Sequence, residues 1–395
     1  MVLGKLRPVG SKVPKPEPSS TMLPWEDKYL YEFTRSGTDA LSLAVGLAIV
    51  DRADVESPEV LIPAYGCPDL VAAVVAQGAT PVVVDLADQQ TPRMDAESVA
   101  AAITSNTVAV IAVDFLGIPE RLDALSAICQ ANNLLLIEDS AQCFPPESVE
   151  TGVADLVILS FGRGKPINLM GGGALLIRKD HHSRFSPVVS RYSVLPLKID
   201  FFWYLKRFLF NLMLSRVSYV CMEKLPFLHL GETRLHFLGE VHRLDLPKRL
   251  VSAGVSEFYS RPVWQRVYDR KLSFLDDCGW VRLHAFCDAQ ENGAKPRLRY
   301  ALLAPNGPMR DQIISGLNKA GIAANSFYGR ALPDIDGVAE CLGGTGSCIA
   351  ADEFASRLLT LPCHDGVSER DINITVGRFS ADLDSTGNYS PPSTG

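Results

Sequence analysis

The chain has 395 residues, which is long enough for two or three domains. Apolar residues make up 47% of it and charged residues 21%, so a chain that is disordered throughout is excluded. The formal net charge of -7 argues against nucleic acid as a partner, because phosphate contacts need clustered lysine and arginine.

The nine cysteines are widely spaced and include no C-x-x-C pair. Their odd number argues against a disulfide framework, and their spacing argues against a structural zinc site. The seven histidines show no H-E-x-x-H spacing, so we predict no metal site. The first twenty residues lack the apolar stretch of a signal peptide, and we expect a cytoplasmic protein.

Residues 1–29 begin with a stretch rich in proline, lysine and serine, and we expect a flexible arm there. Apolar runs then predict buried strands over 60–65, 80–86, 108–115, 133–139 and 154–161. Helical patterns lie between these runs, over 41–50, 69–78 and 121–132. Strands that are apolar throughout and separated by helices predict a mostly parallel sheet covered on both faces.

A segment dense in aromatic residues and leucine follows, over 189–238. Its longest uncharged stretch is far below the ~20 residues that a membrane span needs. Polar residues recur at helical spacing, so we expect an amphipathic helix within 199–220. The favoured interpretation is a helix packed against the body or a partner subunit. The alternative is a peripheral helix on a membrane or a lipid-linked substrate, with Lys206 and Arg207 near head groups.

The remainder of the chain predicts a smaller α+β unit. A helix is expected over 254–277, a strand over 297–305 and a further helix over 309–322. Residues 381–395 are rich in proline, serine and glycine, and we expect them to be disordered.

Two chemistry-bearing features in the first half lie beside strand ends, where open α/β sheets bind ligands. Ser36, Gly37 and Thr38 precede an apolar helical run, an arrangement suited to binding a phosphate. Asp139 closes a buried strand, and a buried carboxylate needs a partner such as a cationic ring nitrogen. Taken alone, the first feature is more typical of an ordinary helix cap, and the strand-end aspartate is equally typical of one.

Two further features follow the strand over 154–161. Ser160 closes that strand, and Lys165 stands in the glycine-rich turn after it as a candidate Schiff-base nucleophile. Glycines 171–173 then form a tight turn. The order of phosphate cradle, strand-end aspartate and lysine is typical of an enzyme that uses pyridoxal 5'-phosphate (PLP). Neither G-x-x-x-x-G-K-[ST] nor a strand-following G-x-G-x-x-G is present, which disfavours the other phosphate-binding folds.

These segments resemble the DegT/StrS family of PLP-dependent sugar aminotransferases. The resemblance lies in SGTDAL (36–41), IEDSAQ (137–142), SFGRGK (160–165) and NSFYGR (325–330). It implies a fold type I, α/β architecture. A large domain at 30–250, with a mostly parallel seven-stranded sheet and the insertion at 189–238, would be joined by a small α+β domain at 251–380. It also implies a homodimer.

The resemblance further implies roles for single residues. Lys165 would bind PLP as a Schiff base and move a proton during the reaction, and Asp139 would pair with the pyridinium nitrogen. Gln142 would contact the ring, and Tyr328 would lie at the mouth of the substrate site. The phosphate would be bound by Ser36, Gly37, Thr38 and Ser160.

The chain departs from the family pattern at three positions. Cys67 stands where the family has an aromatic residue over the PLP ring, so Tyr65 is the alternative stacking residue. Gly171 stands where the family has an acidic residue. The N-x-R motif that a neighbouring subunit offers the phosphate is not found, and its nearest counterpart is VHR at 241–243. These changes leave the lysine chemistry intact and leave the substrate open.

The leading hypothesis is transfer of an amino group from glutamate to a keto group on a nucleotide-linked sugar, in polysaccharide or glycoconjugate biosynthesis. A sugar dehydratase is disfavoured, because related dehydratases have histidine in place of the lysine. Two alternatives stay open. One is a PLP enzyme acting on a non-sugar or lipid-linked ketone, which would give the segment 189–238 a purpose. The other is a non-catalytic scaffold or regulator with the same fold.

Overall fold

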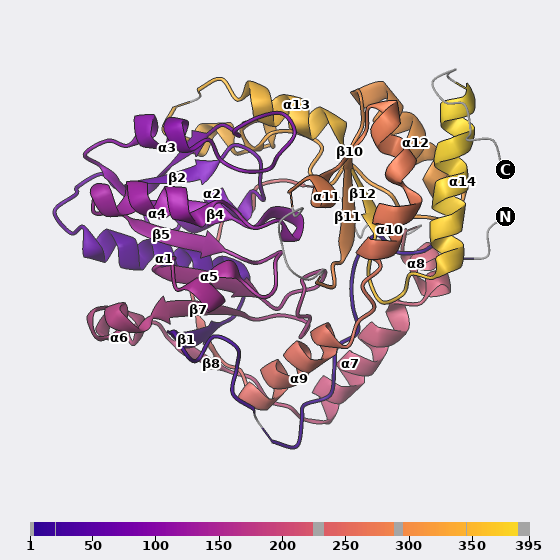
Figure 1. Ribbon diagram of the computed structural model, residues 1–395. Helices are drawn as coiled ribbons and strands as arrows, with labels where there is room; N and C mark the ends of the chain where they lie inside the picture. The colour runs from indigo at the N-terminus through magenta and orange to yellow at the C-terminus, as the bar shows by residue number, and fades with distance from the viewer. Residues whose placement is uncertain (1–3, 20, 224–232, 288–294, 345, 386–395) are drawn as a thin grey trace.

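A computed structural model describes residues 4–19, 21–223, 233–287, 295–344 and 346–385 (Figure 1). It shows a large sheet flanked by helices, with a smaller sheet and its helices beside it. Within these ranges the large sheet has the strand order β3-β2-β4-β5-β6-β7-β1-β9-β8. The strands are β1 (Tyr29–Thr34), β2 (Glu59–Pro63), β3 (Thr80–Val84), β4 (Thr107–Val113), β5 (Leu135–Asp139), β6 (Leu156–Ser160), β7 (Gly173–Arg178), β8 (Val194–Pro196) and β9 (Arg243–Asp245).

The strands from β3 to β6 in this order are parallel, and β7 is antiparallel to both β6 and β1. The predicted α/β fold with a mostly parallel sheet is therefore confirmed. The two strands beyond the seven expected, β8 and β9, have three residues each; β8 lies within the segment 189–238, and β9 follows it. The five strand predictions for β2 to β6 are each right to within a few residues.

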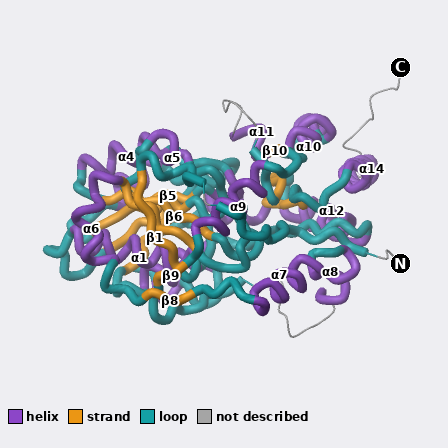
Figure 2. Tube along the Cα trace, turned by 90° about the horizontal axis from the view of Figure 1, so that it is seen from below, coloured by secondary structure: helices purple, strands orange, loops and turns teal. Residues whose placement is uncertain are grey.

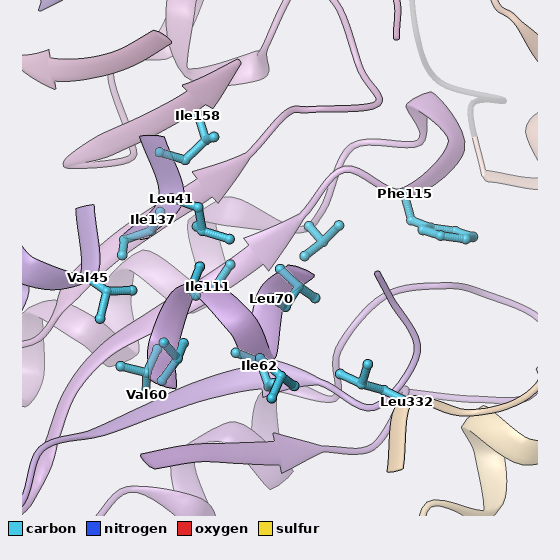
Figure 3. Packing of buried hydrophobic residues seen from close by; sticks show 14 of the residues in the cluster. Leu41, Val45, Val60, Ile62, Leu70, Ile111, Phe115, Ile137, Ile158 and Leu332 are labelled. Carbon is cyan, nitrogen blue, oxygen red and sulfur yellow. The ribbon is translucent and has the colours of Figure 1, made fainter. Parts of the chain in front are cut away.

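Each central strand contributes side chains to hydrophobic layers on both faces of the sheet, because successive side chains point to opposite faces. Val60 and Ile62 pack on one face, and Leu61 between them packs on the other. Figure 3 shows Val60 and Ile62 in the layer that also holds Leu41 and Leu70. One layer is covered by α1 (Gly37–Asp51), α2 (Asp69–Val75) and α6 (His182–Val189), and the other by α3 (Ala96–Ala102), α4 (Leu122–Ala131), α5 (Glu147–Thr151) and α9 (Lys248–Tyr259).

The smaller sheet is antiparallel, with the order β10-β11-β12 among the described residues. Its strands are β10 (Val281–Arg282), β11 (Arg299–Leu303) and β12 (Leu358–Pro362), and the helices around it are α10 (Gln265–Lys271), α11 (Leu283–Cys287), α12 (Gly307–Lys319), α13 (Ile349–Arg357) and α14 (Glu369–Ser385). A third hydrophobic core lies between this sheet and its helices.

Three sequence predictions for this half are corrected. The single helix expected over 254–277 is divided into α9 and α10, because Pro262 cannot continue a helix. Residues 381–385, expected to belong to a disordered tail, are the last residues of α14, which runs to Ser385. Residues 386–395 lie outside the described part of the chain. The boundary drawn at 250/251 falls inside α9, whose Leu250 and Phe258 belong to the core of the large sheet.

The segment that was expected to be a flexible arm packs against the body wherever it is described. Leu6 and Val13 are buried, at 1% and 0% exposed. The Leu6 backbone N–H donates to the carbonyl of Gly321 at 2.8 Å, and Leu6 packs into the core of the smaller sheet. Val13 packs into the core of the large sheet. Its apolar residues thus hold the segment in place despite its prolines.

The aromatic segment forms α7 (Phe201–Met213) and α8 (Arg216–Glu223), which lie at the edge of the molecule (Figure 2). Asp200 caps α7, accepting a hydrogen bond from the backbone N–H of Trp203 at 3.0 Å. The predicted amphipathic helix is present. No helix in the described ranges has the length and apolar content to cross a membrane.

Candidate active site

The carboxyl ends of β4, β5 and β6 lie side by side at one edge of the large sheet. Val113 is paired with Asp139, and Asp139 with Ile158. Two residues further on, β6 ends at Ser160, and the chain turns towards Lys165. A cavity, here called the cofactor cavity, opens at this edge. Its lining includes Gly37, Thr38, Cys67, Asp69, Asp139, Gln142, Ser160 and Lys165.

The first turn of α1 forms one wall of the cofactor cavity. A Cβ atom added to Gly37 would lie 2.6 Å from the Cβ of Ser160, so a glycine is needed for α1 to approach β6 this closely. The backbone N–H groups of a first helical turn lack partners within the helix and attract anions. Ser36 caps α1, with its hydroxyl accepting from the Asp39 N–H at 3.0 Å, and it does not line the cavity. The Thr38 hydroxyl donates to Asp69 at 3.0 Å.

Asp139 is the buried acid of the cofactor cavity, with 8% of its surface exposed. Its Oδ1 accepts a hydrogen bond from the backbone N–H of Ala141 at 3.0 Å. Burial raises the pKa of Asp139, while the Ala141 N–H and the charge of Lys165 act in the opposite direction. A cation placed beside this carboxylate would relieve the cost of burying its charge.

Lys165 lies where the cofactor cavity meets a second cavity, since it lines both. Its Nζ forms no hydrogen bond or ion pair with any described residue. Gln142 also lines both cavities and is held at each end of its amide. Its Oε1 accepts from the Leu116 N–H at 3.3 Å, and its Nε2 donates to the Tyr328 hydroxyl at 3.3 Å.

Tyr328, predicted to lie at the mouth of the substrate site, lines the second cavity. Burial raises the pKa of its phenol well above the ordinary value, so the hydroxyl stays protonated at neutral pH. Of the two residues considered for the PLP ring, Cys67 reaches the cofactor cavity. Tyr65 does not line the cavity. It is 1% exposed and lies within a cluster of rings, 5.1 Å from Phe115 and 5.0 Å from Phe354 between centroids.

The second cavity is here called the cationic cavity, because no Asp or Glu lines it among the described residues. Its basic lining residues are Arg163, Lys165, Lys295, Arg297 and Arg299. The Arg299 guanidinium lies 4.7 Å from the centroid of the Phe327 ring. Burial lowers the pKa of Arg299 to about 10, which leaves it charged at neutral pH. The cavity is thus suited to an anionic ligand.

Sequence reasoning missed the residues that reach these cavities from distant parts of the chain. Arg297 and Arg299 come from the start of β11, and Val9 from the segment preceding the large sheet. The basic pair in RLRY was a visible signal, although the strand containing it was predicted only as structure. Asp69, in the first turn of α2, carried no signal that separates it from an ordinary helix-start acid.

The cofactor cavity fits PLP in its donor set. The amine of Lys165, which has no partner among the described residues, matches the aldehyde of PLP. The buried carboxylate of Asp139 matches the ring nitrogen, and the start of α1 beside the Ser160 hydroxyl matches the phosphate. The close contact of Gly37 with Ser160 leaves no room for a side chain in this cradle. The described residues contain no group of three His, Cys, Asp or Glu side chains that could hold a metal ion.

The α/β fold is similar to that of solved aminotransferase structures. The model of the DegT/DnrJ/EryC1/StrS aminotransferase family matches residues 33–213. A UDP-N-acetyl-3-dehydro-alpha-D-glucosamine 3-aminotransferase of Acidithiobacillus ferrooxidans is 34% identical over 148 residues, 37% of this chain and 39% of the relative. A dTDP-3-amino-3,4,6-trideoxy-alpha-D-glucose transaminase of Micromonospora megalomicea is 25% identical over 334 residues, 83% and 79% of the two chains.

A solved structure extends the likeness to nearly the whole fold. NtdA from Bacillus subtilis, with bound cofactor PMP, has a TM-score of 0.63 at 16% identity, covering 92% of this chain and 78% of that one. The chain is thus similar to the DegT/DnrJ/EryC1/StrS aminotransferase family over residues 33–213.

Proposed function

We propose that the protein is a PLP-dependent aminotransferase that moves an amino group from glutamate to the keto group of a sugar linked through phosphate to a nucleotide. The observation that carries the proposal is the position of Lys165 at the junction of the cofactor cavity and the cationic cavity. Its amine can reach both a cofactor on one side and an anionic substrate on the other.

PLP, when bound, supplies a ring that withdraws electrons from the carbon bearing the transferred amino group. Lys165 Nζ would take a proton from that carbon and return it during the transfer. The Asp139 carboxylate would hold the proton on the ring nitrogen, which keeps the ring electron-poor. The backbone N–H groups at Gly37 and Thr38 and the Ser160 hydroxyl would bind the phosphate.

The substrate side of the proposal uses the cationic cavity. Arg297 and Arg299 would pair with the carboxylates of glutamate or the phosphates of the acceptor, and Gln142 with Tyr328 would orient the reacting end. The names of the two curated relatives support nucleotide-linked sugars as the acceptor class. We place the enzyme, as a homodimer, in polysaccharide or glycoconjugate biosynthesis.

An absorbance spectrum of the purified protein with PLP, repeated after glutamate is added, tests the proposal. The long-wavelength band of lysine-linked PLP is expected first, followed by its loss as the amino group moves to the cofactor. A protein that forms no band with Lys165 intact would contradict the proposal and favour a non-catalytic scaffold. A band that glutamate leaves unchanged would contradict glutamate as the donor.

A second candidate acceptor, a ketone carried on a lipid rather than on a nucleotide, is favoured by one observation. An apolar groove beside α7 shares its walls with the cationic cavity.

A further inference from the structure

Helix α7 buries only one of its sides. Trp203 is 7% exposed and packs into the core of the large sheet. Asn211 holds the preceding segment, accepting from the Val13 N–H at 2.9 Å and donating to the Val13 carbonyl at 3.1 Å. Apart from Lys206 and Arg207, the rest of the helix surface consists largely of exposed apolar side chains, such as Phe202 at 75% and Leu209 at 48%. A large group of exposed apolar side chains on one helix marks a site that a ligand, a partner protein or a membrane covers.

An apolar groove runs between α7 and residues 5–10. Its apolar walls are formed by Pro8, Val9, Met170, Phe202, Leu205, Leu209, Phe210, Met213 and Leu214. Other exposed apolar residues of the same helix, such as Phe208 and Leu212, do not line it. The groove is therefore a feature of one strip of the helix surface.

The groove adjoins the cationic cavity. Val9, Arg163, Gly164 and Arg299 line both, so these residues form a neck between the two. Lys165 lines the cationic cavity and does not line the groove. A ligand that fills the groove and passes the neck would thus enter the cavity that Lys165 lines.

The charge around the groove is of one sign. Its basic lining residues are Lys5, Arg7, Arg163, Lys206 and Arg299, and no acidic residue lines it among the described positions. Arg7 is paired with Asp365 at 2.8 Å. Arg299 forms no ion pair with a described residue and stands at the neck, where an anion would neutralise it. The groove thus combines an apolar body with a cationic inner end.

We infer that the groove binds the hydrocarbon chain of a lipid-linked acceptor, with the linking phosphate at the neck and the keto sugar in the cationic cavity. The inference rests on the amino transfer proposed above and develops its second candidate acceptor, the ketone carried on a lipid. A nucleotide would leave the apolar walls of Phe202, Leu205 and Leu209 in water. A hydrocarbon chain covers these walls, and its phosphate matches Arg163 and Arg299.

The test measures calorimetric binding of decyl phosphate, kept below its micelle concentration, to the full-length PLP-loaded protein. Decyl phosphate is expected to bind at least about tenfold more tightly than inorganic phosphate, because the chain is buried in the groove. Leu209→Asp, on the groove wall, is expected to weaken decyl phosphate binding by about tenfold or more. Leu212→Asp makes the same change on the same helix outside the groove and is expected to stay within about twofold of the unsubstituted protein. Circular dichroism checks that both variants are folded.

Three results would overturn the inference. Equal affinity for decyl phosphate and inorganic phosphate would show that no chain is bound. Equal losses in the two leucine variants would show that the effect is not specific to the groove. A Leu209→Asp protein that differs from the unsubstituted protein in oligomeric state would show that a second copy covers the groove. The glutamate spectrum needs no acceptor, so a failure of the proposed amino transfer is recognised separately.

Discussion

Lys165 and Asp139 reach the cofactor cavity from neighbouring parallel strands, and both could be predicted from the sequence. Each closes or follows an apolar run, and the carboxyl ends of parallel strands meet at one edge. The sequence could not distinguish Cys67 from Tyr65, because both stand in the same loop after β2. Packing distinguishes them, since the ring of Tyr65 completes an aromatic cluster that the linear sequence does not reveal.

At the residue scale, Lys165→Ala is expected to abolish both the absorbance of lysine-linked PLP and amino transfer, because no other amine lines the cofactor cavity among the described residues. Absorbance spectra recorded while PLP is added measure the first effect. Lys179→Ala changes a lysine outside the cavities, and this control protein should give the same spectra as the unsubstituted protein. A band that persists in Lys165→Ala would show that another lysine carries the cofactor.

Glu120 gives the second residue-scale prediction. It is 3% exposed and accepts backbone hydrogen bonds from Met94 and Arg121, each at 2.8 Å. Burial raises its pKa from the ordinary 4.5 to about 7, so the folded state favours the neutral acid. Its contribution to stability is fully present below the unfolded pKa and is lost as the pH rises through about 7.

The free energy of unfolding of the unsubstituted protein should therefore fall relative to that of Glu120→Gln, by about 3 kcal/mol between about pH 4 and about pH 8. Urea unfolding of both proteins across this range measures the difference. Two curves that stay parallel with pH would contradict the raised pKa.

At the scale of single elements, α1 depends on one glycine. Gly37→Ala would push the helix start away from β6, because the new Cβ meets Ser160 at 2.6 Å. PLP affinity is expected to fall by about tenfold or more, as the phosphate cradle widens. Gly377→Ala, in α14, is the matched control, since its Cβ meets nothing within 4 Å. A titration with PLP measures both, and equal affinities in the two variants would contradict this role of the cradle.

The contact between α7 and residues 4–19 near the start of the chain gives a second prediction at the scale of single elements. Asn211→Ala removes both hydrogen bonds to Val13, at a cost of about 1–3 kcal/mol. Cleavage by trypsin after the exposed Lys12 is expected to become faster, because the segment detaches more often. Asn132→Ala is the control, since Asn132 bonds within its own helix end. Equal cleavage rates in all three proteins would contradict the anchoring.

Elements could be predicted well from the sequence where a local pattern determines their structure. They were predicted poorly where contacts between distant segments determine it. β2 to β6 each contain a run of at least three apolar residues, so their burial can be predicted from the local sequence. The packing of residues 4–19 was not visible, because prolines and lysines dominate there while Leu6 and Val13 supply the burial. The cationic cavity was likewise missed, since it joins Val9, Arg163 and Arg299 from three separate regions.

At the scale of the whole molecule, we expect a homodimer of 2 × 43.0 kDa. The family resemblance, in which a neighbouring subunit completes the phosphate site, is the reason for this expectation. Sedimentation equilibrium of the PLP-loaded protein measures the mass, and Leu212→Asp should leave it unchanged. A protein that is monomeric while it converts glutamate would contradict the prediction.

The contacts of residues 5–14 also determine the order in which parts of the protein fold during synthesis. Arg7 pairs with Asp365, a partner 358 residues further along the chain, and Leu6 bonds to Gly321 and Ala323. During synthesis these early residues leave the ribosome long before their partners exist, so they must wait unpaired while the large sheet folds. Closing so long a loop is a late step of folding. The part of the cationic cavity that Val9 lines is therefore among the last parts to form. In a growing chain, Lys165 and Asp139 would take their positions before the cavity could bind the keto substrate.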